Sequence, residues 1–198
     1  MDTKPSGTVV LPDIAFLKAN IDELQIDNFN QTNFSLLGRP VGNSLLITIN
    51  SNQMNANLEW KKAQNGKEPE LIAHISKLFI PSSARDAAEK SKPVQIQGGW
   101  PAINAVIDDL TYGNMRLGKL ELVARNTPST KGQLWKITKL NLSNSAAQLR
   151  SSGSWLKGFD GGNETNLLIN TNINNLGGLL NRLDMQNLVR SGNGSISG

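Results

Sequence analysis

The chain has 198 residues, a formal net charge of +4 at pH 7 and a sequence pI of about 9.4. It has no cysteine and a single histidine, His74, so neither a disulfide, a cysteine metal site nor a histidine cluster is expected. No run approaches 18 apolar residues and no apolar segment follows Met1, so the sequence predicts neither a membrane-spanning helix nor a signal peptide.

One pattern occurs twice in the sequence. Residues 18–24 (KANIDEL) read like residues 104–110 (NAVIDDL), and the spacing from Gln53 to Trp60 returns from Gln148 to Trp155. The two matches indicate a unit that recurs about every 90 residues, as in repeat proteins. We therefore expect a first β-repeat over 1–97 and a second over 98–198, in one continuous structure. Residues 194–198 resemble 95–99, so the chain is expected to be a fragment of a longer protein.

Most predicted elements are strands, because apolar and polar residues alternate at every second position. Residues 71–78 fit either a short helix or a strand, and their place after Trp60 favours the strand. Residues 84–90 fit a short polar helix, capped by Ser82 or Ser83. Strand alternation then covers the ranges 94–100, 119–124, 147–155 and 167–173.

The range 135–142 contains a change of phase. Trp135 and Ile137 fall on one face, whereas Leu140 and Leu142 are out of step with them, which predicts a bulge or a corner near residues 138–139. Apolar residues at helical spacing predict a helix over 176–183, with Asn175 as its N-cap. Short turn signals separate the strands, so we predict a mainly β fold: an extended, curved antiparallel sheet, forming a U-shaped groove built from repeats with short helices.

The sequence offers little for catalysis. His74 has no spaced partners, and the acidic pair Asp108-Asp109 recurs as Asp22-Glu23, which is typical of a scaffold position. We therefore predict no enzyme activity, no cofactor and no metal. The basic residues of the second repeat indicate a solvated outer face or a surface for anionic lipid, and without aromatic stacking partners they do not indicate nucleic acid. They are Arg116, Lys119, Arg125, Lys131, Lys136, Lys139, Arg150 and Lys157.

From residue 100 onward, a set of short pieces occurs in a characteristic order: 100–102 (WPA), 107–110 (IDDL), 117–125 (LGKLELVAR), 134–137 (LWKI), 140–142 (LNL), 147–149 (AQL), 153–155 (GSW) and 175–183 (NLGGLLNRL). This ordered set resembles the YhdP-like branch of the AsmA-like superfamily of bacterial envelope proteins. The resemblance implies a bridge-like lipid carrier: a long β-groove with an apolar inner face, anchored in the inner membrane and crossing the periplasm. It implies no catalytic residues.

Together, these observations predict a segment that shields and conducts phospholipid acyl chains between the inner and outer membranes. Any oligomer of the fragment is expected to form by pairing of edge strands. The alternative is a structural or adhesive β-repeat module that binds a protein or a glycan, and an enzyme of unrecognised type is the third reading. The tryptophans Trp60, Trp100, Trp135 and Trp155 fit either packing on the sheet or contact with an apolar ligand. The residues expected to line the groove are Ile96, Leu110, Leu120, Leu122, Ile137, Leu140, Leu142, Leu149, Trp155, Leu167 and Ile169.

Overall fold

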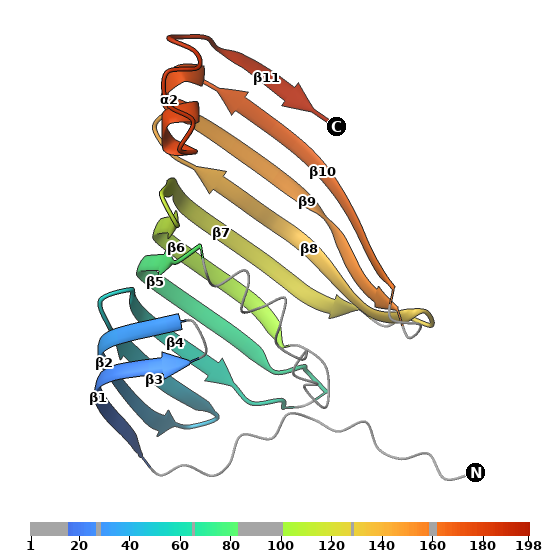
Figure 1. Ribbon diagram of the computed structural model, residues 1–198. Helices are drawn as coiled ribbons and strands as arrows, with labels where there is room; N and C mark the ends of the chain where they lie inside the picture. The colour runs from blue at the N-terminus through green and yellow to red at the C-terminus, as the bar shows by residue number, and fades with distance from the viewer. Residues whose placement is uncertain (1–15, 27–28, 65, 83–100, 128, 159–161) are drawn as a thin grey trace.

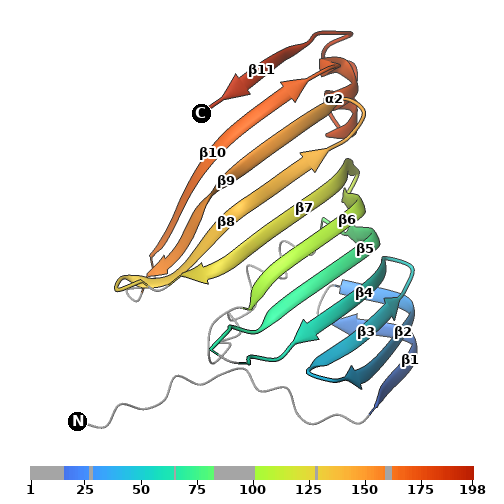
Figure 2. The same cartoon turned by 180° about the vertical axis from the view of Figure 1, so that it is seen from behind.

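The computed structural model describes residues 16–26, 29–64, 66–82, 101–127, 129–158 and 162–198. Over these residues the chain forms a single sheet of eleven strands, in which neighbours in the sequence are also neighbours in space. The sheet is open, and it curls at one end, where β1 and β2 overlap β3 and β4 in both views (Figures 1 and 2). The mainly β prediction is confirmed.

The strands have 4 to 13 residues. They are β1 (Leu17–Ile26), β2 (Phe29–Val41), β3 (Ser44–Asn50), β4 (Met54–Lys61), β5 (Glu70–Ile80), β6 (Ala102–Tyr112), β7 (Met115–Thr127), β8 (Gly132–Ser143), β9 (Ala147–Gly158), β10 (Asn163–Ile173) and β11 (Gly194–Ser197). Residues 71–78 thus belong to a strand, which is the alternative that their place after Trp60 favoured. The helix predicted over 84–90 and the strand predicted over 94–100 lie outside the described residues.

Nine of the ten neighbouring strand pairs are antiparallel, and β5 and β6 are parallel. A simple antiparallel meander was expected, and this joint departs from it. Parallel neighbours require a connection that returns the chain to the same end of the sheet, and residues 81–101 provide the length for it. The two repeated sequence segments lie on β1 and β6, and each begins a series of five strands. The division at 97/98 lies outside the described residues and stays a prediction.

The bulge predicted near residues 138–139 is present. In the pairing of β8 with β9, the register shifts between Ile137 and Leu140. In the pairing of β8 with β7, it shifts between Val123 and Ala124, which pair with Lys139 and Ile137. The extra residues bring Ile137 and Leu140 onto the same face of the sheet. A second shift, between Ile107 and Leu110, does the same on β6.

One α-helix lies within the described residues: α2 (Leu176–Arg182), at the end of the sheet beside the turns of β6–β7 and β8–β9 (Figure 1). The side chain of Asn175 accepts a hydrogen bond from the Gly178 amide at 2.8 Å, so the predicted N-cap is confirmed. Arg182 ties the helix to the sheet through the Ser145 hydroxyl at 3.0 Å. This helix of seven residues lies at one end of the sheet, and no other described element forms a second layer on either face.

Candidate functional site

The strand register aligns apolar residues in continuous rows across the sheet. Residues that are directly paired on neighbouring strands point to the same face, so a row can be followed strand by strand. One row crosses all eleven strands: Ala19, Leu36, Ile49, Ala56, Ile75, Ile107, Leu120, Leu142, Leu149, Thr171 and Ile196. With neighbouring strands about 4.8 Å apart, this row is on the order of 48 Å long.

Two further rows run beside it on the same face. The first consists of Leu17, Gly38, Ile47, Leu58, Ala73, Ala105, Leu122, Leu140, Ser151 and Ile169. The second consists of Pro40, Leu45, Trp60, Leu71, Ile103, Ala124, Ile137, Gly153 and Leu167. We call the surface that carries these three rows the apolar face, and its reverse the polar face.

The apolar face is only half covered. Eight of the ten buried hydrophobic residues point to it, Ala102 and Ala146 being the exceptions, yet no large side chain among the described residues is fully buried. Ile169 and Ile196 are 36% and 62% exposed. The extensive contacts between described elements all join sheet neighbours, apart from that of α2 with β7. A sandwich would bury such a face against a second sheet, whereas here the side chains shield mainly one another.

The ten described groove candidates share the apolar face. Leu120, Leu142 and Leu149 lie in the eleven-strand row, and the others lie beside it on β6 to β10. Ile96 lies outside the described residues. Contact of these residues with lipid stays a prediction.

The sequence-based set omitted the first half of the face. Leu36, Ile49 and Ile75 continue the eleven-strand row through β2, β3 and β5. Alternation in 45–49 and 56–60 was available as a signal for these strands. What it could not supply was the register that aligns them with the second half, because register depends on contacts between distant strands.

Three tryptophans point to the apolar face: Trp60 on β4, Trp135 on β8 and Trp155 on β9. Trp135 and Trp155 are directly paired, with ring centroids 6.3 Å apart in an edge-to-face arrangement. Each is half-buried, so each both packs on the sheet and presents surface to solvent. Trp100 lies outside the described residues.

The polar face carries ion pairs within and between strands. The Glu121 carboxylate on β7 forms an ion pair with the Lys139 Nζ of β8 at 2.7 Å. The Nζ of Lys119, on the same strand as Glu121, lies 3.7 Å from the carboxylate. The hydrogen bond from Lys139 is the main cause that lowers the pKa of the Glu121 carboxyl below its ordinary value, and Asn141 and Lys119 act in the same direction. Glu70 on β5 similarly lies within 3.6 Å of Lys61 and 3.4 Å of Arg125. This arrangement fits a solvated outer surface.

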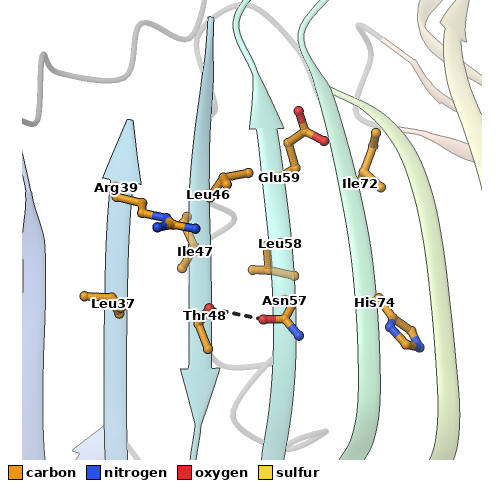
Figure 3. Close-up of a pocket in the computed structure, with 10 residues that line it drawn as sticks. All are labelled: Leu37, Arg39, Leu46, Ile47, Thr48, Asn57, Leu58, Glu59, Ile72 and His74. Atoms are coloured by element: carbon orange, nitrogen blue, oxygen red, sulfur yellow. Dashed lines mark hydrogen bonds between the residues drawn. The ribbon is translucent and has the colours of Figure 1, made fainter. Parts of the chain in front are cut away.

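A shallow depression of about 250 Å³ lies on the polar face of β2 to β5 (Figure 3). Leu37, Arg39 and Glu59 point into it, as does His74 from β5. None of the groove candidates lines it. His74 contacts Asp108 of β6 at 2.9 Å, and both side chains are exposed, so this pair bridges the parallel joint at the surface.

Within the described part of the chain, no group of three or more His, Cys, Asp or Glu side chains is placed to hold a metal ion. The described helix is also too short to cross a membrane. The distinctive feature is therefore the continuous apolar face.

The family model described as YhdP protein matches residues 2–198. The chain belongs to the YhdP family. A search of curated proteins and a search of solved structures each found no match. Membership of the YhdP family suggests a role in lipid transport in the bacterial envelope, in a family without enzymatic activity.

Proposed function

We propose that the apolar face shields phospholipid acyl chains from water and conducts them along the sheet between the inner and outer membranes. In this proposal the segment works in the periplasm, as part of a longer protein anchored in the inner membrane. The observation that carries the proposal is the row that crosses all eleven strands on a half-covered face, with an apolar residue at every position except Thr171.

The energetics favour such a path. Exposing an acyl chain of about 16 carbons to water costs on the order of 12 kcal/mol, at about 0.8 kcal/mol per methylene. A continuous apolar surface removes most of that cost at each position along its length. Because the face extends perpendicular to the strands, every further strand lengthens the path by about 4.8 Å.

The opposite face supports the same function. Lys119, Glu121 and Arg150 keep the reverse of the sheet hydrated, so lipid contact is confined to one side. A lipid head group would remain in water at the open side of the face, which predicts weak selection between head groups.

Neighbouring residues on opposite faces provide the test. Leu122 pairs with Leu140 on the apolar face, whereas Val123 pairs with Lys139 on the polar face. Leu122 and Val123 are both half-buried. The protein would be purified without detergent, incubated with phosphatidylethanolamine vesicles and analysed by native mass spectrometry. We expect lipid adducts with the wild type and Val123→Asp, and their loss with Leu122→Asp or Leu142→Asp.

Circular dichroism would verify that all variants remain folded. A wild-type chain that stays free of lipid after incubation would contradict the proposal and favour the structural β-module. Equal binding by Leu122→Asp and Val123→Asp would show that the lipid does not occupy the apolar face.

A further inference from the structure

The apolar face contains one buried hydroxyl. Ser151 on β9 is 8% exposed, and it is the buried polar residue of the described chain. It is paired with Leu140 on one side and Ile169 on the other, so it points to the apolar face. Its Oγ has no hydrogen-bond partner among the described residues. A buried hydroxyl without a partner destabilises a fold, whereas an alanine here would carry no such cost.

The next position of β9 on this face has no side chain. A Cβ at Gly153 would overlap the carbonyl oxygen of Asn166 on β10, so the close approach of the two strands requires glycine there. On this face, β9 therefore presents two small residues in succession, and larger side chains of β8 and β10 lie on both sides of them. We call these two positions and the four side chains around them the β9 notch: Ser151 and Gly153, with walls formed by Ile137, Leu140, Leu167 and Ile169.

The surroundings of the notch define the chemistry it fits. Its walls are aliphatic, and the charged residues beside it on β8 and β9, Lys136, Lys139 and Arg150, belong to the polar face. A carboxylate in the notch would be a buried charge without a counter-ion, which is strongly unfavourable. A plain hydrocarbon would leave the hydroxyl without a partner. A neutral hydrogen-bond acceptor attached to an apolar chain satisfies both requirements.

We propose that the β9 notch binds the ester group of an acyl lipid: the side chains that cover Ser151 move aside, and its hydroxyl donates a hydrogen bond to the ester carbonyl oxygen. The acyl chain then lies along the flanking aliphatic rows and the head group stays outside. This inference rests on the proposed function, and it makes the notch a place where a moving lipid pauses in a fixed register. Recognition depends on the ester and not on the head group.

The test compares two lipids that differ only at this group. Equimolar vesicles of diester and diether phosphatidylethanolamine with the same chain length would be offered to the protein, and the two adducts would be quantified by native mass spectrometry. An ether oxygen is a weaker acceptor than an ester carbonyl, so the wild type should favour the diester by roughly two- to tenfold. Ser151→Ala should bring the ratio close to one while the diether still binds.

Ser152→Ala is the matched control, because Ser152 lies on the polar face, paired with Leu168. It should keep the wild-type ratio. Ser151→Ala should also unfold at no lower temperature than the wild type, since the hydroxyl has no partner to lose.

A wild-type ratio near one, a preference that survives Ser151→Ala, or a marked loss of stability in that variant would overturn the inference and leave the apolar path intact. Absence of both adducts would instead contradict the proposed function, and this inference with it.

Discussion

The indole rings of Trp135 and Trp155 meet edge to face across β8 and β9, with their planes at 77°. Both residues lie on the apolar face beyond the β9 notch, next to the turns that end the strands. Aromatic pairs in this geometry contribute about 0.5–1.5 kcal/mol beyond the area that they bury. The pair therefore stiffens the strand ends that are most distant from α2.

A double-mutant cycle should measure this contribution. Trp135→Leu and Trp155→Leu should each lower the free energy of unfolding, and their effects should be coupled by about 0.5–1.5 kcal/mol in urea titrations. The comparison cycle is Trp60→Leu with Trp155→Leu, because β4 and β9 are well separated in the sheet. Additive effects at Trp135 and Trp155 would show that the rings do not interact.

The ion pairs of Glu121 predict a pH dependence. Because Lys139 lowers the pKa of the folded carboxyl, the stabilisation is present above the ordinary pKa of Glu and is lost as pH falls through the folded value. An NMR titration should give a Glu121 midpoint below the ordinary value of 4.5. Lys139→Met should move this midpoint upward, and Glu121→Gln should flatten the acid limb of the stability profile.

Arg150→Met is the control for that titration, because Arg150 is on the same face but contacts Gln148. It should leave the Glu121 midpoint close to its wild-type position. A midpoint unchanged by Lys139→Met would contradict the assigned cause of the lowered pKa.

Two alanines on the apolar face should respond differently to enlargement. Ala124 is fully buried between Ile103 and Ile137, whereas Ala105 is half-buried. Ala124→Leu should destabilise the protein by about 1–3 kcal/mol because three added carbons have no space. That corresponds to a fall in Tm of about 2–4 °C per kcal/mol for a chain of this size. Ala105→Leu should lower the free energy of unfolding by clearly less. Equal losses in the two variants would contradict the difference in burial between Ala124 and Ala105.

Local sequence patterns predicted much of the second half of the sheet. Alternation identified β7, β9 and β10, the change of phase between Ile137 and Leu140 located a bulge in β8, and Asn175 with spaced leucines located α2. Each of these features depends on residues a few positions apart, so the sequence carries them directly. The ten described groove candidates, chosen from such patterns, all lie on the same face of the sheet.

Features that depend on distant strands were not predicted. The parallel pairing of β5 and β6 is one of them, because alternation does not record the direction of a strand. Ser151 was missed because a serine in an alternating strand has the same pattern whether it is covered or exposed. Its burial results from Leu140 and Ile169 on the two neighbouring strands, which only the register brings beside it.

The close approach of β9 and β10 at Gly153 gives the last prediction. A Cβ there would overlap the Asn166 carbonyl oxygen and come within 2.9 Å of the Leu167 Cα, both of which are backbone atoms that no rotamer change can move. Gly153→Ala should therefore destabilise the protein by more than about 1 kcal/mol.

Gly194→Ala is the control for Gly153→Ala, because its Cβ would meet nothing within 4 Å. It should leave the free energy of unfolding unchanged or raise it by up to about 1 kcal/mol, since alanine restricts the unfolded chain. Urea titrations of both variants would measure the difference. If Gly153→Ala were as stable as Gly194→Ala, β9 and β10 would be further apart than the structure has them, and the walls of the β9 notch would lie too far apart for Ser151 to be buried between them.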